Sequence, residues 1–138
     1  MPSEDNPTAT PRPEAADGQS HPLVLALEAH KTGDLDQAII ICRRFLREDP
    51  VHADALQILG VFERLAGNAE EAESLLRRSL IFNPAQPHVW SNLATIMLED
   101  YRIEEAADAA EAALEISRDY LPALSILARI AEARGQIV

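Results

Sequence analysis

Side chains able to do chemistry are few in this chain, and their spacing matches no catalytic or metal site. The 138 residues include four histidines and one cysteine. Two histidines that bind a metal from one helix face lie four residues apart, and the set His21, His30, His52 and His88 contains no such pair. Cys42 has no catalytic base nearby that would favour the thiolate, so we interpret it as a buried packing residue. We expect no metal, no cofactor and no enzymatic activity.

The charge balance excludes further classes of partner. Aspartate and glutamate outnumber lysine and arginine, and the formal net charge is −11. Nucleic acids and anionic membrane surfaces are bound through clusters of basic side chains, which we do not find here. No apolar run approaches the length that spans a bilayer, and residues 1–20 lack the apolar core of a secretory signal. We therefore expect a cytoplasmic protein that binds neither nucleic acid nor membrane.

The elements that must position any site are helical. Residues 1–20 are rich in proline and charge and contain no Leu, Ile, Val or Phe, so we predict that this tail is disordered. Helical periodicity starts at Pro22, and no segment alternates as a strand does. Asp34 with Gln37, and Asn68 with Glu71, have the spacing of capping boxes. The predicted helices cover residues 22–32, 34–48, 53–66, 69–82, 87–100, 103–117 and 121–134.

The helices recur with a period of 34 residues. One register holds leucine throughout, at Leu25, Leu59, Leu93 and Leu127. A second holds alanine, a third proline, and a fourth glycine. Such a fixed period indicates a stacked repeat protein, and repeats of this kind present binding surfaces more often than catalytic centres. The members of the other registers are Ala38, Ala72 and Ala106; Pro50 and Pro84; and Gly33, Gly67 and Gly135.

Tyr101 occupies the slot in which the other repeats carry glycine. Glycine adopts a positive φ without strain at the end of a helix. Tyrosine in that conformation would carry a strain of roughly 1–2 kcal/mol. Either this turn closes differently from the others, or packing of its neighbours holds Tyr101 in place.

These registers resemble the tetratricopeptide repeat, whose pattern is W-x2-L-G-x2-Y followed by A-x3-F and P. The third repeat matches it with Trp90, Leu93, Ala94 and Met97, and then with Ala106 and Ala110. The resemblance implies an all-α, right-handed superhelical solenoid of antiparallel helix pairs with about three and a half repeats. The domain would cover residues 21–138, with repeats at about 19–52, 53–86, 87–120 and 121–138, the last one partial.

The resemblance also implies a concave groove that is lined by the first helix of each pair. Its mildly apolar, mixed lining suits an extended peptide or a partner helix with aliphatic anchors. The expected partner-binding residues are Leu27, Asp54, Gln57, Ile58, Val61, Arg64, His88, Ser91, Asn92, Thr95, Ser125 and Arg129.

Two known uses of this groove do not fit the lining. Family members that grip a chaperone's C-terminal carboxylate do so with Lys and Asn, whereas here the slots are Leu23, Leu27, Gln57, Val61, Ser91 and Thr95. Relatives among the O-linked N-acetylglucosamine transferases carry a ladder of asparagines at one slot. Here that slot reads Val24, Ile58, Asn92 and Ile126, which gives a single rung.

Charged side chains of the repeats leave alternatives open. Arg64 and Arg129 could each anchor a partner's carboxylate or form an ion pair, with Asp54 and Glu132 respectively. Acidic side chains such as Glu104 and Glu105 make the second helices acidic, which indicates a solvated convex face or a docking site for a basic partner.

We expect a non-catalytic module that binds a protein or a peptide. Two alternatives remain: an accessory, substrate-recruiting domain of a larger bacterial glycosyltransferase, sulfotransferase or oxygenase, and a secretion-type chaperone that holds a client segment. Helix 121–134 opens a repeat without a second helix to cover Leu124, Ala128 and Ala131. We expect residues beyond Val138 or a second copy of the chain, as a homodimer, to cover that face.

Overall fold

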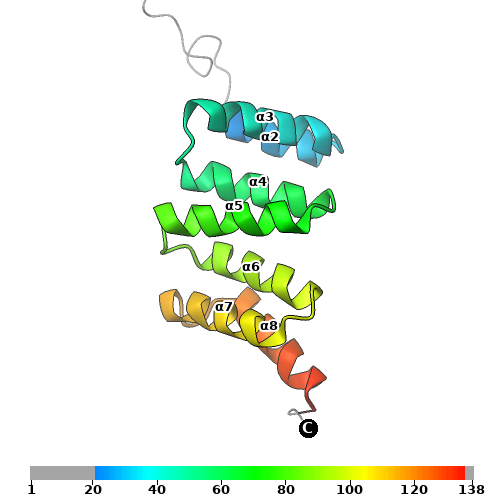
Figure 1. The fold of residues 1–138 in the computed structure, drawn as a ribbon, viewed down its shortest axis with the longest axis vertical. Coiled ribbons are helices and arrows are strands. Elements are labelled where there is room, and N and C mark those ends of the chain that lie inside the picture. The colour runs from blue at the N-terminus through cyan, green and yellow to red at the C-terminus, as the bar shows by residue number, and fades with distance from the viewer. Residues whose placement is uncertain (1–20, 136–138) are drawn as a thin grey trace, which may run out of the picture. The chain divides into compact units, whose positions relative to one another are not determined.

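A computed structural model of the chain describes residues 21–135, so the predicted disorder of residues 1–20 lies outside the described residues. Within the described range there are seven α-helices and no strand. The predicted helices are confirmed, with ends that differ by at most one residue. The helices, labelled as in Figure 1, are α2 (Pro22–Lys31), α3 (Leu35–Glu48), α4 (Ala53–Leu65), α5 (Ala69–Phe82), α6 (Pro87–Glu99), α7 (Ile103–Ile116) and α8 (Leu121–Ala133).

The helices form two compact units that divide between Pro50 and Val51. In the first unit α2 and α3 pack against each other as an antiparallel hairpin. Ala26 of α2 and Ala38 and Cys42 of α3 are fully buried between them. Small side chains at these positions let the two helix backbones approach closely.

The second unit contains the hairpins α4–α5 and α6–α7, followed by α8 alone. Helix α6 lies at its centre and contacts α4, α5, α7 and α8. Figure 1 shows these helices following one another in order, and a core of aliphatic side chains runs through α5–α8. None of the described helices combines the length and the apolar character needed to cross a bilayer.

All four turns of the glycine register have the same left-handed conformation. The φ angles are +93° at Gly33, +94° at Gly67, +69° at Gly135 and +61° at Tyr101. The third turn also closes with the same hydrogen bond as the second, since the amide of Arg102 donates to Met97 O at 2.9 Å and that of Asn68 to Glu63 O at 2.8 Å. Tyr101 is 88% exposed, so packing does not hold it in this conformation.

The two predicted capping boxes have different outcomes. Asp34 caps α3 as expected, because its Oδ1 accepts a hydrogen bond from the amide of Gln37 at 3.0 Å. The capping box at Asn68 is wrong, since its side chain makes no cap hydrogen bond. Asn68 Nδ2 instead donates to Oε1 of the buried Glu63 at 2.7 Å. A buried carboxylate requires hydrogen-bond donors, and Asn68 supplies one to Glu63.

Candidate functional site

Three first helices of the second unit lie side by side, because α6 contacts both α4 and α8. Helices α4, α6 and α8 carry eleven of the twelve expected groove residues; Leu27, the twelfth, lies exposed on α2 of the first unit. We call these eleven positions the first-helix surface. Asp54, Ser125 and Arg129 are exposed, Ser91 is buried, and Gln57, Ile58, Val61, Arg64, His88, Asn92 and Thr95 are half-buried.

An ion pair connects α4 with α6 across this surface. Arg64 Nη1 lies 3.1 Å from Glu99 Oε2. The alternative in which Arg64 pairs with Asp54 is not realised, since Glu99, 35 residues later on the next first helix, takes that place. The pair neutralises Arg64 and leaves it less free to anchor a partner's carboxylate.

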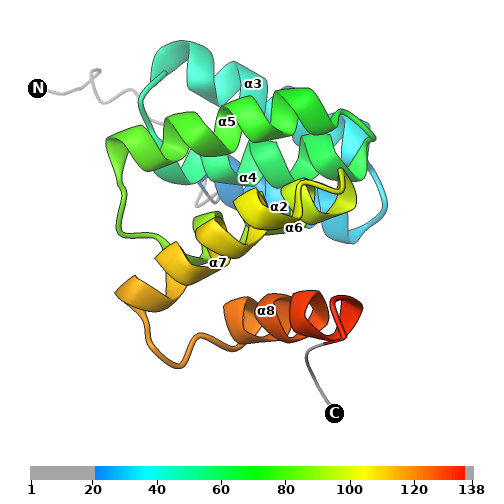
Figure 2. The same ribbon diagram turned by 60° about the horizontal axis from the view of Figure 1, so that its bottom comes forward.

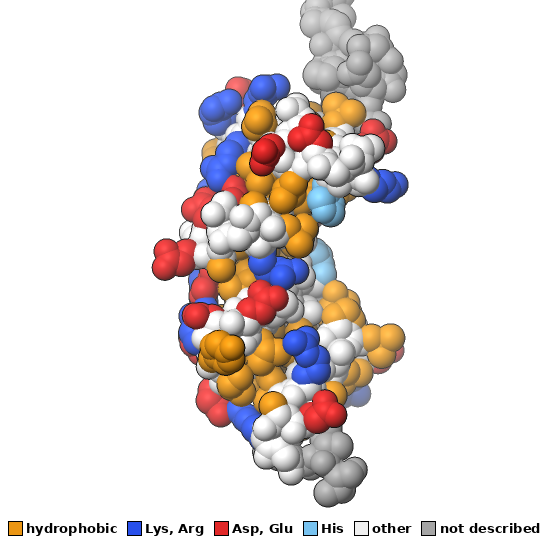
Figure 3. Space-filling model, turned by 90° about the vertical axis from the view of Figure 1, so that its right-hand side faces the viewer, with side chains coloured by type: hydrophobic (Ala, Val, Ile, Leu, Met, Phe, Trp, Pro, Cys, Tyr) orange, Lys and Arg blue, Asp and Glu red, His pale blue; other side chains and the backbone are white. Residues whose placement is uncertain are grey.

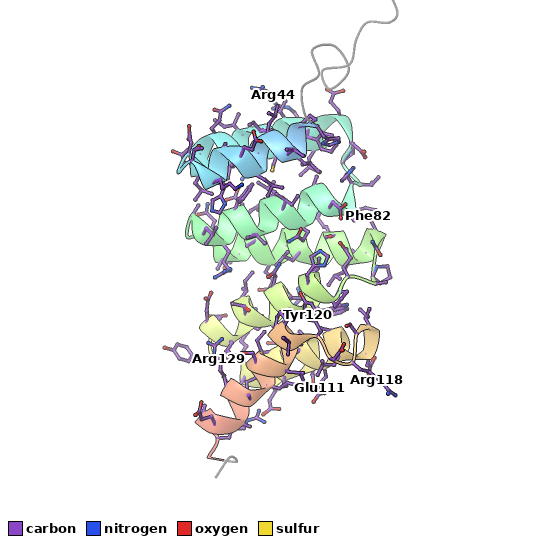
Figure 4. All side chains as sticks on the ribbon, turned by 180° about the vertical axis from the view of Figure 1, so that it is seen from behind. Arg44, Phe82, Glu111, Arg118, Tyr120 and Arg129 are labelled. Carbon is purple, nitrogen blue, oxygen red and sulfur yellow. The ribbon has the colours of Figure 1, made fainter. Side chains whose placement is uncertain are left out.

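Arg129 differs from Arg64, because it forms no salt bridge within the described residues. Among residues 21–135 no acidic side chain forms a salt bridge with it, so the alternative pairing with Glu132 is not present. Figure 4 shows Arg129 on the opposite side of α8 from Glu111 and Arg118, which belong to α7 and to the α7–α8 connection. An exposed guanidinium without a carboxylate is able to bind one supplied by a partner.

Two groove positions of the repeat pattern, Ser91 and Ile126, are buried and not accessible to a partner. Ser91 is 5% exposed, and its carbonyl accepts a hydrogen bond from Thr95 Oγ1 at 3.1 Å. Ile126, which takes the asparagine-ladder slot on α8, is buried in the core. The surface therefore changes character along its length: aliphatic at Ile58 and Val61 of α4, neutral and polar at Asn92 of α6, and cationic on α8.

Two of the histidines, His21 and His52, form hydrogen bonds that cap helices. The amide of Leu23 donates to His21 Nδ1 at 3.0 Å, and the amide of Ala55 donates to His52 Nδ1 at 3.1 Å. Each imidazole therefore caps the first turn of a helix as a hydrogen-bond acceptor. In the described part of the chain, no three His, Cys, Asp or Glu residues are grouped closely enough to hold a metal ion.

A second charged cluster lies at the turn between α6 and α7, along a cleft that Glu99 also lines. Arg102 Nη2 lies 2.6 Å from Glu73 Oε1, and Arg77 Nη2 lies 2.7 Å from Glu73 Oε2. Asp100 and Glu105 also lie within ion-pair distance of Arg102. These contacts cross-link α5 to the third hairpin along a cleft of about 230 Å³.

The arginines of this cluster change the pKa of Glu73. Partial burial raises the pKa of its carboxyl, but hydrogen bonds and charge attraction from Arg102 and Arg77 outweigh burial, and the net result is a lowered pKa. Glu73 therefore belongs to a structural ion-pair cluster and is not the freely solvated acid that the acidic second helices suggested.

The outer surface contains apolar as well as charged side chains. Figure 3 shows hydrophobic side chains distributed between arginines and acids along one face of the molecule. Trp90 is partly buried against the core, and its Nε1 donates to Pro84 O at 3.2 Å. This fits the expected packing role of Trp90 better than a stacking role for a ligand.

Known structures share this arrangement of helices. A crystal structure of MamA matches 83% of this chain and 67% of its own, with 21% identity and a TM-score of 0.77. The first TPR of Spaghetti (RPAP3), bound to an HSP90 peptide, matches 83% of this chain and 93% of its own, with 19% identity and a TM-score of 0.77. This chain has the tetratricopeptide-repeat fold. The predicted all-α solenoid of antiparallel helix pairs is thereby confirmed.

A third tetratricopeptide-repeat match is more similar in sequence. The O-GlcNAc transferase of Thermobaculum terrenum is 30% identical, with a TM-score of 0.75, over 80% of this chain. The match covers only 21% of the transferase, so this chain spans about a fifth of that enzyme. No protein-family model and no curated protein sequence matches the chain.

Sequence reasoning missed the residues that lock the repeats together. Glu99 was not considered as the partner of Arg64, although the repeat period contains the signal. Adjacent first helices place residue i near i+34, and Glu99 is one position beyond that. Arg102 was likewise overlooked, because its main partner, Glu73, lies 29 residues earlier in the chain.

Proposed function

We propose that this tetratricopeptide-repeat chain is a protein-interaction module that binds a peptide or a partner helix on its first-helix surface. The observation that carries the proposal is the row of partly open side chains on α4, α6 and α8. The side chains of Val61 and Asn92 are half-buried, so a partner can contact them while the helices hold them in place. The exposed Arg129 has no ionic partner within residues 21–135. Rigid helices that present such a row form a prepared binding surface.

The chemistry of the surface suggests what it would bind. Val61 offers apolar area for an aliphatic side chain, and the amide of Asn92 can both donate and accept a hydrogen bond to a peptide backbone. Arg129 can take a carboxylate in a bidentate manner. We therefore favour an extended segment that carries an aliphatic residue and an acidic one, spaced to reach α4 and α8 respectively.

The solved neighbours support a binding role. The RPAP3 domain was solved with an HSP90 peptide, and another RPAP3 domain, 17% identical to this chain with a TM-score of 0.74, with an HSP70 peptide. Those peptides end in EEVD, and this chain lacks the lysines and asparagines expected of a carboxylate clamp. We infer that this chain also binds a peptide, but one of a different sequence. We assign no catalytic role to any residue of the surface.

A second candidate is an accessory domain that recruits substrates to a larger enzyme. The observation that favours it is the 30% identity to the repeat region of the O-GlcNAc transferase. The asparagine slot argues against an identical role, because Asn92 is its only asparagine and Ile126 is buried. Under either candidate, the first-helix surface would do the binding.

Selection from a random peptide library tests the proposal without a known partner. Peptides selected on the wild-type chain are titrated against Val61→Glu and Asn92→Ala, with helicity checked by circular dichroism. A charge at Val61 removes apolar contact area, so we expect affinity to fall by about tenfold or more, which corresponds to roughly 1.4 kcal/mol.

The control places substitutions on the outer surface of α7. Glu104→Lys with Glu105→Lys should leave the affinity of the selected peptides unchanged. Peptides that tolerate both first-helix substitutions but are lost on this charge reversal would move the binding site to the acidic second helices.

A further inference from the structure

Helix α8 exposes an apolar stripe whose counterparts in α4 and α6 are buried or half-buried. Leu121 is 73% exposed and Leu124 is 41% exposed. Ala128 is exposed and Ala131 half-buried on the same side of the helix. We call these four residues the α8 seam. Ser125 borders this seam, and Arg129 lies farther round the helix axis.

The repeat register shows what this seam would normally meet. Leu56 and Gly60 of α4 are the counterparts of Leu124 and Ala128, and both are buried beneath α5. In α6 the counterpart of Ala128 is Ala94, which is likewise fully buried. Figure 2 shows α8 with α7 on one side and no described helix on the other.

We propose that the α8 seam is a self-association surface, on which the seam of a second copy packs antiparallel. Spacings of three and four residues between Leu121, Leu124, Ala128 and Ala131 place them at a and d positions of a heptad. In an antiparallel pair centred near residue 126, Leu124 meets the second copy's Ala128, and Leu121 meets its Ala131.

This pattern is complementary to itself. Each layer sets a leucine against an alanine, and a large side chain facing a small one favours interdigitation. A two-fold contact requires one patch to fit a second copy of the same patch, and the seam does so in antiparallel orientation only. In parallel orientation Leu124 would meet leucine and Ala128 would meet alanine, which leaves layers of unequal width.

The charges around the seam permit the contact. Arg134, at the end of α8, is already paired with Glu104 of α7. Arg129 lies farther round α8 from the seam. This register brings Arg134 to the level of the second copy's Arg118, but Glu104 already neutralises Arg134. The net charge of −11 on each chain opposes association at long range, so the contact should strengthen when salt screens that repulsion.

Four side chains per copy form a small interface, so we expect a weak dimer whose population depends on concentration. Sedimentation velocity over a concentration series, repeated at about 0.05 M and about 0.5 M NaCl, measures it on the full chain. We expect monomer and dimer in exchange, with more dimer at the higher salt.

Substitutions locate the contact. Leu121→Lys cannot disturb the fold, because Leu121 is largely exposed, and it should raise the dimer dissociation constant by about tenfold or more. Leu124→Lys should do the same. Ala133→Lys adds the same charge to the polar side of the same helix and is the matched control, with an unchanged dissociation constant.

Crosslinking tests the orientation. Chains that carry Leu124→Cys are mixed with mass-tagged chains that carry Ala128→Cys and are oxidised, while Cys42 stays buried. Antiparallel packing gives the mixed disulfide in excess over both products formed between like chains, whereas products between like chains would overturn this orientation.

Three results would overturn the proposal itself. A monomer at all concentrations shows that the seam does not self-associate. A dimer that survives Leu121→Lys and Leu124→Lys lies elsewhere on the chain. A dimer that weakens at high salt rests on charge attraction, such as a contact between the arginines of α3 and the acids of α7.

Discussion

Leu76 fills the space that a side chain at Gly60 would occupy. A Cβ atom added to Gly60 would lie 2.9 Å from Cδ2 and 3.0 Å from Cγ of Leu76. Leu76 is fully buried. The register counterparts of this pair are Ala26 with Cys42 and Ala94 with Ala110, and in both the second helix carries a smaller side chain than leucine. The glycine of one helix and the leucine of the next are thus matched in size.

Gly60→Ala should destabilise the chain although alanine favours helix. The helix preference of alanine gains up to about 1 kcal/mol over glycine, whereas overpacking a filled core costs about 1–3 kcal/mol. We expect a net loss of about 1 kcal/mol in the free energy of unfolding, measured by urea denaturation. An increase in stability would show that Leu76 yields at little cost.

Replacing both residues tests the size match directly. Leu76→Ala alone leaves a cavity and should cost about 2–5 kcal/mol. The double variant Gly60→Ala with Leu76→Ala recreates the alanine pair of the third repeat. We expect its loss to be smaller than the sum of the two single losses by about 1–2 kcal/mol. If the loss of the double variant equals the sum of the two single losses, Gly60 and Leu76 are not matched in size.

Tyr101 carries strain that glycine would relieve. Its φ of +61° is unfavourable for a residue with a Cβ atom. Because Tyr101 is largely exposed, packing contacts do not compensate this strain. Tyr101→Gly should stabilise the second unit by about 0.5–1 kcal/mol, because relief of about 1–2 kcal/mol of strain exceeds the entropy that glycine adds to the unfolded chain. The melting temperature measures it, with Gly67→Ala as the control that should change stability in the opposite direction.

Cys42 should be chemically silent in the folded chain. Burial raises the pKa of its thiol to about 12, so almost no thiolate exists at pH 8, and no part of the side chain is exposed. A thiol reagent should modify it only at the rate at which the first unit opens, and rapidly in denaturant. Fast labelling of the native chain would show that the α2–α3 hairpin is loosely packed.

The Glu73 cluster should make stability fall in acid. A carboxyl with a lowered pKa in the folded chain binds fewer protons there than in the unfolded chain. Its stabilisation is complete above the unfolded pKa of about 4.3 and is lost as the pH falls through the lower, folded value. Glu73→Gln should remove about 0.5–1 kcal/mol at pH 7, and the gap between the two proteins should close on acidification. A gap that persists at low pH would assign the loss to packing.

The helices and turns followed from the sequence because their causes are local or periodic. Glycine in one register predicted the left-handed turns, and the small residues of the repeat predicted which helices pack closely. The period also placed Tyr101 in the glycine slot, but it could not show that the turn keeps its geometry despite the cost. That outcome depends on the backbone hydrogen bonds that close the turn, such as the one from the amide of Arg102 to Met97 O.

The repeat period indicates which positions approach each other, but it does not select the ionic partner. Asn68 has the type and spacing of a helix cap, yet the buried carboxylate of Glu63 competes for its side chain and wins. Arg64 had an acidic candidate on its own helix, and the structure pairs it with Glu99 on another. Both outcomes depend on which side chains the fold brings together, and the repeat pattern constrains backbones more tightly than side-chain partners.

Photocrosslinking of a selected peptide tests the central claim, binding on the first-helix surface, most directly. A photoreactive residue is placed at Asp54 or Ser125, both exposed on that surface, and at Arg78 or Glu111, which are exposed on second helices. We predict peptide adducts at the first two positions and none at the last two. Adducts confined to positions 78 and 111 would contradict the account and assign binding to the second helices.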